Sequence, residues 1–264
     1  NSNDKVINLL HLELEEFFLK CYSTRYNEVA NRIEVKDKEG VYIELDDNTI
    51  WHAFCKKLEA SGYKAVTKEK ILSVVASREV SPIYNPITEF LKNLPESTLE
   101  DPITNLCDYI VLDDEDDKPR LIKCLKKWFV GAIKTLTGDY VHKQCIVFKG
   151  AQEIGKTEFC RALVPKELRR DYYKHVEMFN PEDKDTSMML SQYFIGLIDE
   201  IDDFLSNLKN KRSYKSFMTL KNVNQRLPYG KTNVSRKRII SFLATCNEST
   251  FLNDPTGTSR FTVF

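Results

Sequence analysis

The stretch that decides the fold is Gly150-Ala151-Gln152-Glu153-Ile154-Gly155-Lys156-Thr157, which places two glycines, a lysine and a hydroxyl at fixed spacing. The apolar run Cys145–Phe148 precedes it, and a segment with helical spacing, Thr157–Leu163, follows it. A strand, a glycine-rich turn and a helix in this order predict a loop whose backbone amides wrap around phosphate. In such a loop Lys156 neutralises the β- and γ-phosphates, and the Thr157 hydroxyl binds Mg²⁺. The octapeptide therefore predicts a site for ATP and Mg²⁺.

A second apolar run ends in two adjacent acids, in the stretch Tyr193-Phe194-Ile195-Gly196-Leu197-Ile198-Asp199-Glu200. Beside a phosphate loop, a carboxylate at a strand end holds Mg²⁺ through water, and a neighbouring carboxylate polarises the attacking water. We therefore expect Asp199 to hold the metal and Glu200 to act on water. The alternative is that such acids cap the next helix, a role that Asp202 and Asp203 can also fill.

Two further polar residues are candidates for the same site. Asn247 follows a third apolar run, Ile239–Thr245, and a polar residue at such a strand end can sense the γ-phosphate or orient water. The alternative for Asn247 is an ordinary turn residue. Arg260 follows the turn Asp254–Gly257 and is expected to act as an arginine finger on the nucleotide of a neighbouring subunit. The alternative for Arg260 is an ion pair that stabilises the fold.

The order of the apolar runs predicts the fold class. After Gly138, short apolar runs alternate with helical segments, which is typical of an α/β core with a mostly parallel central sheet. We expect residues 138–264 to form this P-loop core and residues 1–137 to form a smaller α+β region that is mainly helical. Helical spacing of apolar residues predicts helices over 6–20, 49–60, 67–77, 87–94 and 119–136.

The charges are segregated along the chain, although 39 Lys and Arg balance 39 Asp and Glu. Residues 93–117 carry nine acids and no Lys or Arg, whereas residues 204–247 carry ten Lys or Arg and no acid. Such segregation favours a binding partner on the basic part, and the alternative is a solvated basic face.

The cysteines and histidines give no sign of a structural metal or of a disulfide framework. The seven cysteines are odd in number and none are C-x-x-C spaced, and the four histidines are scattered. This usage fits a reducing, cytoplasmic compartment. No apolar run approaches the roughly 18 residues that a membrane span needs, so we expect no membrane partner.

Four blocks of the sequence resemble the virulence-associated E family, which are P-loop ATPases of phages and mobile elements related to superfamily 3 helicases of the AAA+ class. The blocks are Gly150–Thr157; Ile198–Glu200; Leu220-Lys221 through Pro228-Tyr229-Gly230-Lys231; and Ser241–Asn247 with Asp254–Gly257 and Arg260-Phe261. The stretches Arg25–Glu28 and Tyr84–Ile87 also resemble the region that precedes the ATPase core in that family.

The resemblance implies an ATP-driven, homo-oligomeric ring, a hexamer in the full-length protein, that acts on single-stranded or forked DNA during replication, with partners such as a primase. It also implies a hairpin between the second and third core strands that contacts DNA. The residues assigned to that contact are Lys221, Arg226, Tyr229 and Lys231. The alternative is that the three cations among them pair with acids of the next subunit.

The chain departs from the family in two ways. Ser259 stands where the family usually has a second arginine, which leaves Arg260 as one candidate finger. Family members also continue further, so we expect the core to be C-terminally truncated. Two other functions remain open: a nucleotide-gated DNA-binding or scaffold protein with negligible turnover, and a P-loop kinase of small molecules.

Overall fold

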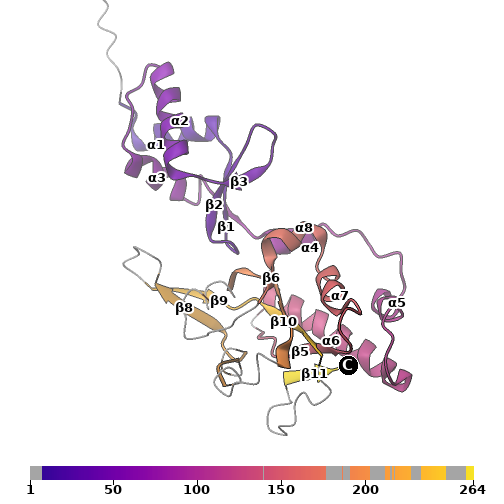
Figure 1. Cartoon of the computed structure of the whole chain (residues 1–264). Helices are drawn as coiled ribbons and strands as arrows, with labels where there is room; N and C mark the ends of the chain where they lie inside the picture. The colour runs from indigo at the N-terminus through magenta and orange to yellow at the C-terminus, as the bar shows by residue number, and fades with distance from the viewer. Residues whose placement is uncertain are drawn as a thin grey trace, which may run out of the picture. The chain divides into compact units, whose positions relative to one another are not determined.

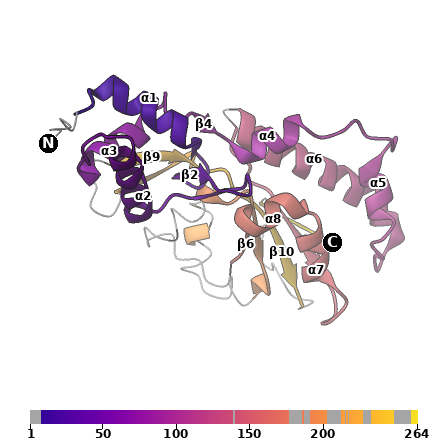
Figure 2. The same cartoon turned by 90° about the horizontal axis from the view of Figure 1, so that it is seen from above.

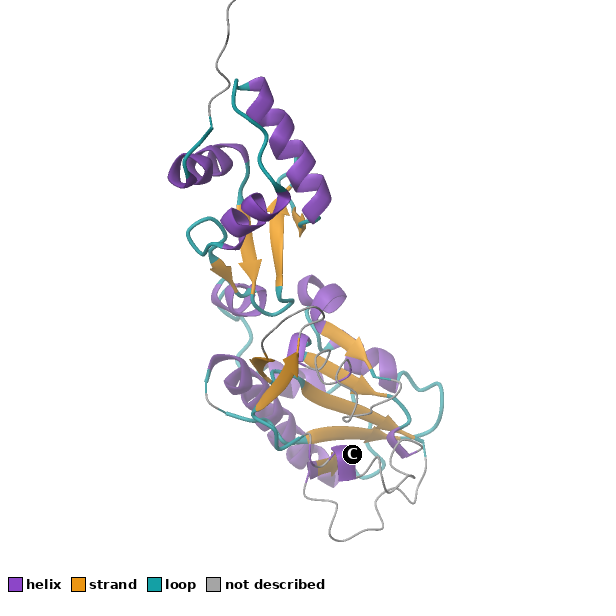
Figure 3. Ribbon diagram, turned by 90° about the vertical axis from the view of Figure 1, so that its left-hand side faces the viewer, coloured by secondary structure: helices purple, strands orange, loops and turns teal. Residues whose placement is uncertain are grey.

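The chain forms two compact units, which divide between Glu89 and Phe90. The computed structural model describes residues 8–138, 140–176, 186, 191–202, 212–214, 216, 218–226, 233–247 and 260–264. Each unit has its own sheet with helices packed on it (Figures 1 and 3). The division lies earlier in the chain than the 137/138 boundary, which was predicted from the alternation of apolar runs and helical segments after Gly138.

The first unit is an α+β domain around a four-stranded sheet of order β3-β2-β1-β4. Strand β1 runs antiparallel to β2 and parallel to β4, and β2 runs antiparallel to β3. Its elements in chain order are α1 (His11–Cys21), β1 (Thr24–Asn27), β2 (Arg32–Lys36), β3 (Tyr42–Glu44), α2 (Asp47–Ala60), α3 (Lys68–Ala76) and β4 (Ile83–Tyr84).

The apolar faces of the three helices α1, α2 and α3 form the core of this unit. Phe18, Phe54 and Ile71 are fully buried there, one from each helix. On the sheet, the guanidinium of Arg25 lies 3.9 Å from the ring centre of Tyr42, and it pairs with the buried Glu34 at 2.7 Å. The predicted helices of this region are therefore present, whereas β1 and β4 were not predicted.

The second unit is built on a five-stranded sheet of order β11-β5-β10-β7-β6, in which every neighbouring pair is parallel. The expected α/β core with a mostly parallel sheet is thus confirmed. Its elements in chain order are α4 (Pro86–Lys92), which spans the division, α5 (Pro102–Cys107), η1 (Glu115–Asp117), α6 (Lys118–Thr137), β5 (Cys145–Lys149), α7 (Lys156–Ala162), α8 (Lys166–Tyr172), β6 (Tyr173–His175), β7 (Ile195–Ile198), β8 (Asn222–Arg226), β9 (Asn233–Lys237), β10 (Ser241–Cys246) and β11 (Phe261–Val263).

The two faces of this sheet have different covers, because side chains alternate along a strand. On β5, Cys145 and Val147 pack in a cluster with Tyr214. The alternate residue Phe148 meets the ring of Phe159 in α7, with ring centres 5.3 Å apart. The central strands β10 and β7 are buried along their whole length, so the core of the unit lies on both faces of the sheet.

Helix α6 belongs to the second unit because it packs on this sheet. It runs over 20 residues, and Figure 2 shows its length from above. Trp128 is 1% exposed, and its Nε1 donates a hydrogen bond of 2.9 Å to the backbone oxygen of Phe242 in β10. This packing explains why the unit begins before residue 138. In the part of the chain that the structure describes, no helix has both the length and the apolar composition needed to cross a membrane.

The pair β8–β9 is an antiparallel hairpin whose base is fixed by Arg238. The buried guanidinium of Arg238 donates to the backbone oxygens of Ile240 at 2.8 Å and His142 at 2.6 Å. Burial lowers the pKa of Arg238 to about 10, so the side chain stays charged at neutral pH. Arg238 therefore ties the hairpin both to the start of β10 and to the segment that follows α6.

Gly131 in α6 provides a test of this packing. Alanine normally stabilises a helix interior relative to glycine by roughly 0.5–1 kcal/mol. Here a Cβ at Gly131 would lie 2.7 Å from the ring of the buried His142, whose Nδ1 is 3.0 Å from Ser241 Oγ. We therefore expect Gly131→Ala to destabilise the protein, by about 1–3 kcal/mol, measured by chemical denaturation. The neighbouring Val130→Ala, at an exposed position, should change stability by about 0.5 kcal/mol or less.

Candidate functional site

The carboxyl ends of four neighbouring strands, β5, β10, β7 and β6, lie side by side at one end of the five-stranded sheet. The register pairs Thr245 of β10 with Phe148 of β5, and Ala244 of β10 with Ile198 of β7. His175, the last residue of β6, pairs with Leu197 of β7. Ligands of open parallel sheets bind at the carboxyl ends of the strands, so this end of the sheet is the candidate site.

The octapeptide follows β5 and forms the turn into α7. Gly155 precedes the helix at φ +89°, a left-handed conformation that suits glycine, and residues 151–155 are exposed. The Lys156 ammonium folds back over the loop, where Nζ donates to the backbone oxygens of Gly150 at 2.8 Å and Ala151 at 2.6 Å. The loop thus holds one positive charge close to its own backbone.

Asp199 accepts hydrogen bonds from two hydroxyl groups, one in the first turn of α7 and one near the carboxyl end of β10. Thr157 Oγ1 donates to both carboxylate oxygens of Asp199, at 3.0 and 3.1 Å. Thr245 Oγ1 also donates to Asp199 Oδ1. On the remaining side His175 Nε2 lies 3.6 Å from Asp199 Oδ2. The residue predicted to hold metal is therefore next to the predicted hydroxyl ligand.

Asn247 connects the loop lysine with the second acid. Its Oδ1 accepts a hydrogen bond from Lys156 Nζ at 3.0 Å, and its Nδ2 donates to Glu200 Oε1 at 3.0 Å. Glu200 has φ +50°, and its backbone amide donates to Thr245 Oγ1 at 3.2 Å. A non-glycine residue in the left-handed region is strained, and such strain is found preferentially at functional sites. The three sequence blocks are thus joined by direct side-chain contacts.

Sequence reasoning missed Thr245 and His175. Thr245 lies within an apolar strand, where threonine reads as a β-branched strand residue. The available signal was spacing, since residues 245 and 247 are two apart and therefore lie on the same side of the strand. His175 ends β6, a three-residue strand without an apolar run, and the sequence offered no signal for it.

The side chains at this end of the sheet fit a Mg²⁺ nucleotide. A hydroxyl and a carboxylate are hard oxygen donors, and Mg²⁺ is usually bound by one or two protein groups with phosphates and water. Among the described residues, no group of three or more His, Cys, Asp or Glu is arranged to hold a metal ion. Burial raises the pKa of the nearby Tyr173 to about 12 and that of the Cys160 thiol still further, so both are neutral at pH 7.

The other predicted residues lie elsewhere. Arg260 comes immediately before β11, whose Phe261 pairs with Cys145 at the amino end of β5, so the structure does not bring Arg260 to the loop of its own chain. Lys221 is exposed and precedes β8. The backbone of Arg226 ends β8, opposite Asn233 of β9. Tyr229 and Lys231 lie outside the described residues.

Comparison with known proteins identifies a matching family model and two solved structures with a similar fold. Residues 96–264 match the family model of the virulence-associated protein E-like domain. Two A form apo structures of the NrS-1 C-terminal region are similar to the chain, each at 14% identity. The one of residues 305–718 has a TM-score of 0.55 and covers 96% of this chain and 60% of that one. The other has a TM-score of 0.52 and covers 95% and 60%.

At this identity the likeness shows a shared fold alone, and this chain spans 60% of the length of those structures. A search of curated proteins finds no significant sequence match.

Proposed function

This chain belongs to the virulence-associated protein E-like domain family, and we propose that it carries the ATP-hydrolysing, AAA+-like P-loop core of a DNA-dependent ATPase that acts in the replication module of a phage or mobile element. The observation that carries the proposal is the contact of Asn247 with both Lys156 and Glu200, at 3.0 Å each. One side chain thereby touches the group proposed to bind phosphate and the group proposed to act on water.

Each residue of the site has a proposed task. The backbone of residues 150–157 and the Lys156 ammonium bind the β- and γ-phosphates. Thr157 and Asp199 would hold Mg²⁺, which would neutralise phosphate charge. Glu200 accepts hydrogen bonding from the attacking water and polarises it. Asn247 orients Glu200 and senses whether Lys156 is engaged by the loop or by phosphate.

DNA binding and ring assembly are further parts of the proposal. The antiparallel β8–β9 hairpin lies in the acid-free stretch 204–247, and we assign Lys221, Arg226, Tyr229 and Lys231 to DNA contact. Arg260 lies at the opposite end of its strand from the loop of its own chain, which supports a finger role toward a neighbouring subunit. The partners proposed are single-stranded or forked DNA and further copies of this chain in a ring.

Turnover with and without DNA tests the proposal. We expect ATP hydrolysis that requires Mg²⁺ and rises when single-stranded DNA is added, measured by phosphate release alongside mass by light scattering. Transfer of the γ-phosphoryl group from ATP to a small-molecule acceptor in place of water, at a rate that DNA does not change, would identify a kinase. ATP-dependent DNA binding without turnover would identify a nucleotide-gated scaffold, and either result would overturn the ATPase assignment.

A further inference from the structure

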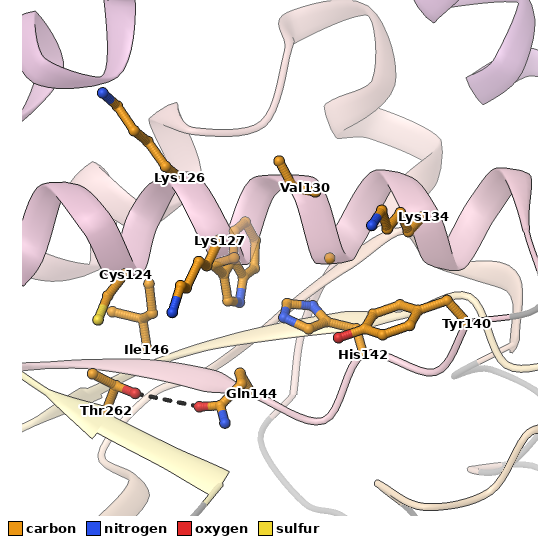
Figure 4. Close-up of a pocket in the computed structure, with 12 residues that line it drawn as sticks. Cys124, Lys126, Lys127, Val130, Lys134, Tyr140, His142, Gln144, Ile146 and Thr262 are labelled. Carbon is orange, nitrogen blue, oxygen red and sulfur yellow. Dashed lines mark hydrogen bonds between the residues drawn. The ribbon is translucent and has the colours of Figure 1, made fainter.

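A groove of about 580 Å³ lies between α6 and the edge of the sheet formed by β5 and β11 (Figure 4). Its floor includes Gln144, Ile146 and Thr262, and Thr262 Oγ1 donates to Gln144 Oε1 at 3.3 Å. Gln144 precedes β5, Ile146 lies in its amino half, and Thr262 of β11 pairs with Ile146, whereas the phosphate loop follows the carboxyl end of β5 at Lys149. The groove is therefore separate from the candidate nucleotide site.

Lys127 and Lys134 of α6 line one wall of the groove, and the row of exposed lysines on that helix extends beyond the groove to Lys123. The helix contains six Lys or Arg and no acid. Lys123, Lys127, Val130 and Lys134 are exposed and follow one another at helical spacing, so they form a single stripe. In the described part of the chain, no acid pairs with these three lysines. Lys126, by contrast, pairs with Asp101 and holds the pKa of that carboxyl at about 2.

The lysine stripe has the length of a short nucleic-acid segment. From Lys123 to Lys134 the helix rises about 16 Å, at about 1.5 Å per residue. A stacked strand advances about 3.4 Å per nucleotide, so the stripe runs alongside about five phosphates. Figure 4 shows Lys127 pointing from α6 toward the strands, and Lys126 pointing away from them.

An aromatic pair and the base of the hairpin lie at the far end of the groove. Tyr140 is 43% exposed and stacks on His142, with ring centres 6.4 Å apart. Lys237, the last residue of β9, donates from Nζ to the backbone oxygen of Gly138, where α6 ends. The lysine stripe, the exposed aromatic ring and the basic hairpin are thus consecutive along one surface of the second unit.

We propose that this groove binds the backbone of single-stranded DNA, with Lys127 and Lys134 on phosphates and Tyr140 stacked on a base. Unpaired lysines beside an exposed aromatic ring are the combination that single-strand binding surfaces use. The choice of DNA rests on the proposed function, since the carboxyl end of α6 beside the groove is hydrogen-bonded to Lys237 of the hairpin assigned to DNA. The site is an addition to that hairpin and extends the DNA path along α6.

A second copy of this chain is the competing occupant. Residues 113–117 are all acidic, and they follow Tyr109 and Val111, which are 85% and 90% exposed. Such a segment could place acids on the lysine stripe of a neighbour. The exposed ring of Tyr140 beside Lys127 and Lys134 favours DNA, and the experiment separates the two occupants.

The test is the salt dependence of binding to fluorescein-labelled oligo(dT), followed by anisotropy between about 50 and 200 mM NaCl. Loss of two phosphate contacts in Lys127→Gln/Lys134→Gln should flatten the log–log slope by about 1.4, at about 0.7 per contact on single strands. If the parent and variant curves meet near 1 M salt, the variant binds about 25-fold more weakly at 0.1 M. Tyr140→Ala should lower affinity about fivefold or more without changing the slope.

The matched control is Lys166→Gln/Arg170→Gln, which removes the same charge from the exposed side of α8 in the same unit. This control should keep the parental slope. If the double lysine variant melts below the parent, the single Lys127→Gln replaces it, with an expected flattening of about 0.7.

A parental slope in the lysine variants overturns the groove assignment. If the slope is parental and the mass measured by light scattering also falls in these variants, the lysine stripe is a contact between copies of this chain. The binding assay contains no ATP, so its result stands whether or not the chain hydrolyses ATP. Absence of turnover therefore overturns the proposed function alone, and an unchanged slope overturns the groove alone.

Discussion

Lys156→Ala is expected to lower ATP turnover about a hundredfold or more, the scale of losing a preorganised group that stabilises transition-state charge. The ammonium is held by the oxygens of Gly150, Ala151 and Asn247, all within 3.0 Å. Alanine removes the positive charge of the loop and leaves Asn247 without its donor. Steady-state phosphate release and nucleotide affinity, measured together, check the result.

The control for this variant is Lys149→Ala. Lys149 is exposed and ends β5 one residue before the loop, so its removal takes away the same charge beside the site without touching the loop contacts. We expect it to retain turnover within about threefold, and a similar thermal midpoint for both variants excludes unfolding as the cause. Parental turnover in a folded Lys156→Ala variant would refute the ATPase proposal.

Glu200→Gln is expected to bind ATP normally and to hydrolyse it about a hundredfold more slowly, the scale of a lost general base. Glutamine keeps the size of the side chain and an oxygen that can accept from Asn247 Nδ2, so the geometry of the site persists. The change removes only the charge proposed to polarise water. Single-turnover hydrolysis, with binding followed by a fluorescent nucleotide, separates the two steps.

Glu158→Gln is the matched control, because Glu158 is an exposed carboxylate on α7 next to Thr157 and pairs only loosely with Arg161 at 3.4 Å. It should leave turnover within about threefold of the parent, as expected for an exposed surface pair. If Glu200→Gln loses nucleotide binding and keeps the turnover of what is bound, Glu200 has a structural role in the site.

The sequence predicted the interior strands of the second sheet, but it gave no bounds for the edge strand β11 and no sign of the edge strand β6. Strands β5, β7 and β10 are continuous apolar runs because each is covered on both faces, and that pattern is visible without a structure. The edge strands β6 and β11 are three residues long, which is too short for a periodic signal. The boundary at 137/138 was placed where short apolar runs begin to alternate with helical segments. The packing of Trp128 on β10, which that pattern does not contain, decides which unit α6 joins.

The site residues that the sequence predicted are likewise those with a local signal. Lys156, Asp199, Glu200 and Asn247 were predicted because each stands directly after an apolar strand or in the loop motif, and parallel strands bring such positions to one end of the sheet. The contact of Thr245 with Asp199 depends on strand order, which local patterns do not contain. Arg260 lies at the amino end of the parallel strands because of the register of β11, and that register cannot be read from the sequence.

Strand β10 connects the two ends of the second unit as a stiff rod. All six of its residues are buried, and it is about 20 Å long at about 3.3 Å per residue. Arg238 fixes its amino end to the hairpin, and Thr245 and Asn247 touch the acids and the lysine at its carboxyl end. A strand laddered on both sides cannot stretch or hinge, because that would break hydrogen bonds to β5 and β7. A displacement of one end of β10 along its axis would therefore move the other end with it, so the backbone of this strand links the proposed nucleotide site to the hairpin without a relay of side chains.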